Sequence, residues 1–175
     1  ALYEMEIAFA EIDRLTGEDG DASPWTVDRA LRHLLTDITG NTHRAEFCID
    51  KLYSPDSARG RLGLLELRAF EMPPHHQMAM VQSLLVRSLV AWFWDHPFRG
   101  RLVRHGADLH GKHLLPHYVI ADIAQVAEDL REAGHEFDTA WLDPFTEFRF
   151  PCLGTGQIRD QEIELRGPNE PWNCA

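Results

Sequence analysis

Four stretches of the chain alternate apolar and polar residues and are therefore predicted to be β-strands. They span residues 3–10, 44–50, 64–70 and 146–150, and each would present one apolar face and one charged face. Two further strands are predicted in "GQIRDQEIELRG", as a hairpin that turns around Arg159–Gln161. These short strands favour antiparallel pairing.

Three other stretches carry apolar residues at helical spacing. The first follows Ser23-Pro24, an N-cap residue with a first-turn proline, and should run to about residue 39. The second follows Pro73-Pro74, is apolar around most of its girth and is expected at the centre of the core. The third begins near Tyr118 and should stop at Gly134.

Strands and helices mix without a regular βαβ rhythm, so the predicted fold class is α+β, a mostly antiparallel sheet with helices packed on one face. At 175 residues the chain is long enough to bury a proper core and fits a single domain, residues 1–175. It opens on Ala1 without an initiator Met and ends abruptly. We therefore expect it to be a fragment of a longer protein.

Composition narrows the classes of partner. The chain carries 17 Lys+Arg against 28 Asp+Glu, a net charge of −11. Nucleic acids and anionic membrane surfaces both require a basic footprint, so neither is expected as a partner. The three cysteines form no CxxC, which indicates reduced thiols and a cytoplasmic location. No segment approaches 18 uninterrupted apolar residues.

The charged faces of the predicted strands are the main candidates for chemistry, because they carry Glu, Asp and Arg where exposed strands favour Thr, Lys, Ser and Gln. They hold Glu4, Glu6, Arg44, Glu46, Asp50, Glu66, Arg68, Glu147 and Arg149. Mg²⁺ is commonly held by few carboxylates plus substrate phosphates, and the planar fork of Arg grips phosphate oxygens. The pattern suits a metal–phosphate site, with solvent-facing Glu–Arg pairs as the alternative.

Histidine and cysteine give weaker signals. His105, His110, His113 and His117 lie close together, but their spacings match no established zinc pattern. His43 is a candidate metal ligand or substrate contact, and otherwise a loop residue. Cys48 is more simply a small buried residue than a nucleophile. The motifs of serine hydrolases, zinc proteases, dinucleotide-binding folds and P-loop enzymes do not occur.

The block "NTHRAEFCIDKLYSPDSARGRLGLLELRAFEMPP", residues 41–74, resembles a bacterial family of amidoligase-type domains found in or beside transglutaminase-like proteins. The resemblance runs nearly the whole length of the chain, through "LLPHYV", "TEFRFP" and "ELRGPNEPW". It implies a place among the glutamine synthetase-like carboxylate–amine ligases. Their catalytic cup is an antiparallel sheet, and this chain would resemble the C-terminal half of that catalytic domain.

In that superfamily a Glu-x-Glu strand and a later Glu-x-Arg strand supply metal-binding carboxylates and a phosphate-binding arginine. Glu66-Leu67-Arg68 matches the second element. Glu4-Met5-Glu6 has the form of the first, and its part in the site stays open. His43 and Glu46 match the family block and have no assigned superfamily counterpart. The expected site has metal ligands Glu66 and Glu46, ATP contacts Arg68 and Arg44, and catalytic residues Arg68 and His43.

The function implied by the resemblance is ATP-dependent amide-bond formation, with Mg²⁺ and ATP as cofactors. The substrates would be small-molecule or peptide carboxylates and amines, and a transglutaminase-like domain or protein would be a partner. A second copy of the chain could complete the site, so a homo-oligomer stays open. The alternative is a non-catalytic binding or assembly module associated with a transglutaminase-like protein.

Overall fold

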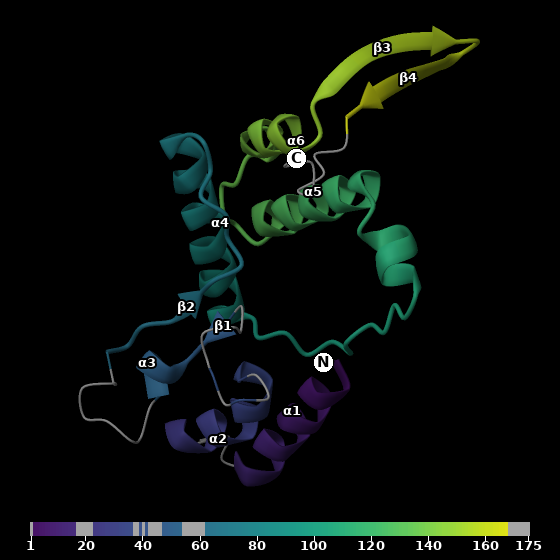
Figure 1. Cartoon of the computed structure of the whole chain (residues 1–175). Helices are drawn as coiled ribbons and strands as arrows, with labels where there is room; N and C mark the ends of the chain where they lie inside the picture. The colour runs from purple at the N-terminus through teal and green to yellow at the C-terminus, as the bar shows by residue number, and fades with distance from the viewer. Residues whose placement is uncertain are drawn as a thin grey trace. The chain divides into compact units, whose positions relative to one another are not determined.

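The computed structural model describes residues 2–16, 23–36, 39, 41, 47–53 and 62–167. In chain order (Figure 1) the elements are α1 Leu2–Thr16, α2 Pro24–Leu35, β1 Phe47–Cys48, α3 Asp50–Tyr53, β2 Glu66–Leu67, α4 His76–Asp95, the π-helix η2 Leu109–His113, α5 Pro116–Glu132, the 3₁₀ helix η3 Thr139–Leu142, α6 Asp143–Arg149, β3 Cys152–Ile158 and β4 Gln161–Arg166. The α+β class is confirmed.

Internal contacts divide the chain into two compact units, residues 1–71 with 101–104, and residues 72–100 with 105–175. The expectation that residues 1–175 form a single domain stays a prediction, because compact units can belong to one domain or to two. None of the helices in the described ranges is long and apolar enough to cross a membrane.

Antiparallel pairing is confirmed, but the described strands form two separate pairs, β1–β2 and β3–β4, in place of one sheet. In the first unit, Phe47 pairs with Leu67 and Cys48 with Glu66. In the second unit, the predicted hairpin is confirmed, with Ile158 paired to Gln161 across the turn. Arg159 in this turn adopts a left-handed conformation with φ of 57°.

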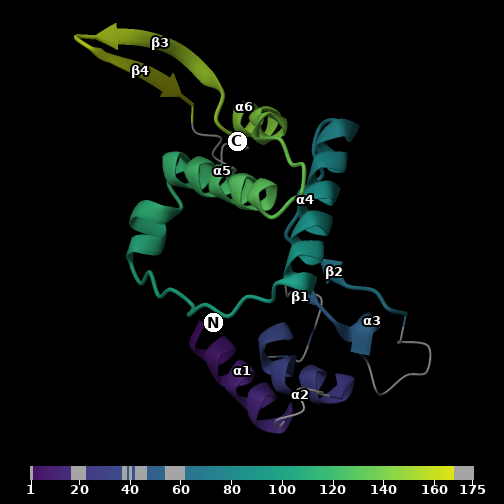
Figure 2. The same cartoon turned by 180° about the vertical axis from the view of Figure 1, so that it is seen from behind.

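The strand predicted for residues 3–10 is wrong, because this segment belongs to helix α1. Its residues are mostly good helix formers, and Glu4 and Arg14 lie at the ends where the helix dipole favours an acid and a base. Ala8 is buried, whereas Tyr3 and Phe9 stay exposed. Burial therefore follows the helical period and not the alternation. Both views show α1 beside α2 (Figure 2).

Helix α2 begins as predicted after Ser23, with Pro24 in its first turn, but it ends at Leu35 and not near residue 39. The hydroxyl of Thr36 donates to the carbonyl oxygen of Arg32 at 2.9 Å, and the backbone of Thr36 is extended. A side-chain hydroxyl that bonds the last carbonyls competes with continuation of the helix. This competition accounts for the earlier end.

The core of the second unit lies between α4 and α5. Ala127, Leu130 and Phe137 are buried there, and partly buried side chains pack on them from α4, α5 and η3: Val81, Leu85, Leu89, Trp92, Val126 and Leu142. The central place expected for α4 is thus confirmed for one face only. Its other side leaves large apolar residues such as Met80 and Trp94 exposed.

Helix α5 ends as predicted just before Gly134, whose φ of 89° needs a residue without a Cβ. The backbone N–H of His135 donates to the carbonyl oxygen of Leu130 at 2.9 Å and closes the helix end. The chain then turns back, so that Phe137 covers Leu130 in the core.

The strand predicted for residues 146–150 is also wrong, since these residues lie in helix α6 and its C-cap. Pro144 occupies the first turn of α6, where its fixed φ suits a helix, and Pro151 prevents continuation. Arg166 fixes the base of the hairpin to α6. It donates to the carbonyl oxygen of Phe150 at 2.7 Å and forms ion pairs with Glu147 and Glu164.

Truncation of the core should destabilise the second unit. Leu130 is 0 % exposed, so Leu130→Ala is expected to lower the free energy of unfolding by about 2–5 kcal/mol. Leu114, 51 % exposed, offers a matched control whose replacement by Ala should cost less than about 0.5 kcal/mol. Denaturant unfolding followed by circular dichroism measures both, and equal losses would contradict the core assignment.

Candidate functional site

The predicted Glu-x-Arg element lies in and just after β2, beside β1. Cys48 of β1 is the direct partner of Glu66, and residues opposite each other in an antiparallel pair project on the same face. The short helix α3 follows β1 and carries Lys51 back toward this face. Three segments of the first unit therefore supply the side chains that surround Glu66.

Two cations converge on the carboxylate of Glu66. Arg68 donates from Nε to Oε1 at 2.9 Å and from a terminal guanidinium nitrogen to Oε2 at 3.1 Å. Lys51 donates from Nζ to Oε2 at 3.2 Å. The prediction that Glu66 and Arg68 share a strand face is confirmed by this two-pronged contact.

The electrostatics of the cluster favour the charged forms of Glu66 and Arg68. Hydrogen bonds from Arg68 and then from Lys51 hold the pKa of Glu66 below its ordinary value. The same contact with Glu66 raises the pKa of Arg68. The side chain of Arg68 is 18 % exposed and that of Glu66 36 %, so Arg68 is the more sheltered partner; the thiol of Cys48 is also within interaction range of Arg68.

The arrangement leaves Glu66 some capacity for a metal ion. A carboxylate has about four lone-pair positions, and the contacts of Arg68 and Lys51 take three of them. Hard carboxylate oxygens suit Mg²⁺, which commonly takes few protein ligands and completes its shell with water and phosphate. The cluster offers one carboxylate ligand for such an ion beside two cationic side chains.

The other predicted site residues are not brought together in the described parts. His43, Arg44 and Glu46 lie outside the described residues. Glu4 and Glu6 stand on helix α1, where residues two apart do not face each other, so they do not form a Glu-x-Glu strand. Glu6 pairs with Arg104 instead.

The histidine cluster does not form a zinc site. The rings of His105 and His113 lie 4.2 Å apart, and His117 contacts the ring of Tyr118 edge-on. Across the parts of the chain that the structure describes, no three His, Cys, Asp or Glu side chains converge as metal ligands.

Two features were missed by sequence reasoning. Lys51 reaches Glu66 across 15 positions of sequence, and only the pairing of β1 with β2 could have revealed it. The second feature is a cavity of about 1290 Å³ in the second unit. Its apolar lining includes Met78, Met80, Val81, Leu84, Trp141 and Pro144, and its polar lining consists of His75, Gln77, Ser83 and Arg87.

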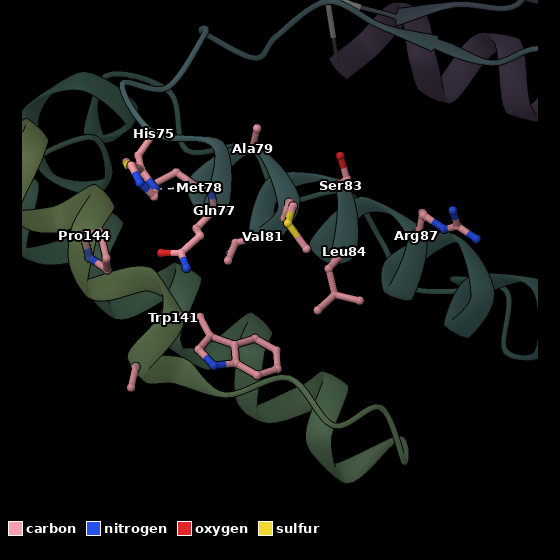
Figure 3. A pocket seen from close by; sticks show the side chains of 12 residues that line it. His75, Gln77, Met78, Ala79, Val81, Ser83, Leu84, Arg87, Trp141 and Pro144 are labelled. Carbon is pink, nitrogen blue, oxygen red and sulfur yellow. Dashed lines mark hydrogen bonds between the residues drawn. The ribbon is translucent and has the colours of Figure 1, made fainter.

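This cavity runs along α4 and is bordered by the segment from η3 into α6. Figure 3 shows Gln77, Val81 and Leu84 on the side of α4 that faces Trp141, while Ala79 and Ser83, which also line the cavity, lie on another side of the helix. Trp141 is held by an edge-on contact with the buried ring of Phe137, whose centroid is 5.4 Å away. The backbone turn that presents it is fixed by Asp138, whose carboxylate accepts from the N–H of Ala140 at 2.9 Å.

Comparison with known proteins gives the chain its family. No curated protein and no solved structure matches it. One family profile matches residues 1–175, the whole chain. The chain therefore belongs to the family described as "Putative amidoligase enzyme (DUF2126)".

Proposed function

We propose that this protein is an ATP-dependent carboxylate–amine ligase. The observation that carries the proposal is membership, over the whole chain, of a family described as "Putative amidoligase enzyme". The paired Glu66 and Arg68 support it, because a carboxylate and a guanidinium side by side are the groups that a metal–phosphate site needs. The glutamine synthetase-like relationship, ATP and Mg²⁺ belong to the proposal.

Arg68 and Lys51 would exchange partners when ATP binds. In the described state both donate to the carboxylate of Glu66. The terminal phosphate of ATP offers the same cations more negative charge and bidentate geometry, so it would compete for them. Glu66 would then be available to Mg²⁺, which would neutralise charge on the phosphates. Glu66 thus holds the two cations in position before the substrate arrives.

The chemistry would run in two displacements. A substrate carboxylate oxygen attacks the terminal phosphorus of ATP, the bond to ADP breaks, and an acyl phosphate forms. The amine nitrogen then attacks the acyl carbon, phosphate leaves, and the amine loses a proton as the amide forms. Arg68 would stabilise the transferring phosphoryl group by positioned charge, which is the main protein contribution to such reactions.

Residues 43–46, just before β1 in the sequence, would complete the site. If the strand extends back from β1, alternation would give Glu46 the face of Cys48 and Glu66, so we propose Glu46 as a second metal ligand. Arg44 would be a further phosphate contact, and His43 would accept the proton of the amine. A transglutaminase-like protein as partner, a second copy that completes the site and a cytoplasmic location remain part of the proposal.

Binding of Mg²⁺ with ATP should depend on the charge of Glu66. The melting temperature of the chain is expected to rise with millimolar ATP and Mg²⁺, because a ligand that binds only the folded state stabilises it. Glu66→Gln should reduce this shift, while Glu162→Gln on the exposed hairpin should not. Differential scanning fluorimetry measures all three, and no shift in the parent chain would favour the non-catalytic module.

Arg68→Lys should impair turnover far more than stability. Lys keeps the charge but loses the planar fork, and the loss of one positioned donor is expected to lower turnover by roughly 10²–10³-fold. Hydroxylamine as the amine, with a panel of amino-acid and peptide carboxylates, would trap the acyl phosphate as a hydroxamate. Arg99→Lys is the matched control. Equal turnover in both variants would leave Arg68 as an ordinary ion-pair partner.

The pKa of Glu66 should depend more strongly on Arg68 than on Lys51. Because that pKa is lowered, the ion cluster stabilises the fold fully above the ordinary value of 4.5, and this contribution is lost as the pH falls through the lowered value. Arg68→Gln should raise the pKa of Glu66 more than Lys51→Gln, since Arg68 is the larger cause. A carbon-detected NMR titration of the Glu carboxyls measures this, and an unchanged pKa in both variants would contradict the cluster.

A further inference from the structure

We infer that the cavity between α4 and the η3–α6 segment binds an elongated apolar molecule with one anionic end, of the alkanoate type. This site lies wholly within the second unit and uses none of the residues assigned to ligase chemistry. The inference is independent of the proposed function. It rests on the shape of the cavity, on its apolar wall and on one charged side chain.

The first step is the shape. The α4 wall extends from His75 to Arg87, which at 1.5 Å per residue is about 18 Å. The cavity volume of about 1290 Å³ exceeds the roughly 300–1,000 Å³ that is usual for compact small-molecule pockets. A trough this long along a single helix suits an extended chain better than a compact ring system.

The second step is the apolar wall. Met80 is 67 % exposed, Leu84 41 % and Trp141 40 %, so apolar area in this cavity is open to solvent. Methionine side chains adapt to irregular apolar partners, and the indole of Trp141 is held in place by Phe137. Covering such a wall removes apolar area from water, which favours binding of an aliphatic chain.

The third step is charge. Arg87 is the one permanently charged side chain among the described residues that line the cavity. Its side chain forms no ion pair or hydrogen bond with another described residue. Arg87 lies beyond Leu84, at the end of the cavity away from His75 (Figure 3). At the His75 end, Nδ1 already accepts from the backbone N–H of Gln77, so a lone cation at one end selects an anionic terminus.

The overall charge of the chain sharpens this argument. Because its net charge is −11, the chain repels anions at long range. A carboxylate that binds must therefore be recognised by local contacts. A cationic amphiphile of equal length would gain the same apolar contacts but would meet the guanidinium of Arg87 as a like charge. A comparison of the two affinities therefore distinguishes recognition by Arg87 from adsorption to an exposed apolar surface.

The experiment titrates the full chain with sodium decanoate and with decyltrimethylammonium bromide, both below their micellar concentrations, by isothermal calorimetry. Decanoate should bind at least about tenfold more tightly, the difference expected from one charge-assisted contact. Arg87→Gln should weaken decanoate binding by a similar factor, and Arg99→Gln should leave it unchanged. Leu84→Gln and Met80→Gln, both at exposed positions, should weaken both ligands.

Three results would overturn the inference. One is the absence of decanoate binding at millimolar concentration in the parent chain. The second is equal affinity for the two amphiphiles, which would mean that a general apolar surface is being coated. The third is equal decanoate affinity in Arg87→Gln and the parent. Circular dichroism and melting temperature of each variant confirm that the fold is retained, and Met80→Gln serves where Leu84→Gln is unstable.

Discussion

The apolar contact between α4 and α5 is the interaction on which the second unit depends. Leu130 and Phe137 fill the space between these helices, and the ring of Phe137 in turn fixes the indole of Trp141. The core therefore determines the shape of the cavity. One wall is the part of α4 next to its buried face, and the other is the turn at Trp141, which Phe137 holds in place. A helix that is apolar around most of its girth but covered on one side leaves apolar side chains such as Met80 and Leu84 exposed along the cavity.

The helices and the hairpin could be predicted where a local signal was strong. Ser23-Pro24 and Gly134 set the ends of two helices, and the turn at Arg159 set the register of β3 and β4. Residues 3–10 and 146–150 were mispredicted because an alternation of five to eight residues also fits part of a helical stripe. Helix propensity in α1 and Pro144 in α6 decided these cases.

The candidate site shows a similar limit. Because strand side chains repeat every two residues, sequence alone could place Glu66 and Arg68 on one face. It could not say that their charges satisfy each other in the described state, nor that Lys51 adds a second cation. That knowledge requires the strand pairing, which joins segments distant in sequence. Glu4 and Glu6 do not form the Glu-x-Glu strand, because residues two apart share a face only where the backbone is extended, and these two lie in helix α1.

The β3–β4 hairpin is held mainly by contacts between its own two strands. Every residue of β3 is exposed, and Arg166 ties only the base of the hairpin to α6. The amide protons of its ladder are therefore shielded from water by the cross-strand hydrogen bonds alone. Such a ribbon opens at a rate of its own, so its hydrogen exchange measures the hairpin's local equilibrium, while exchange in α5 measures that of the core.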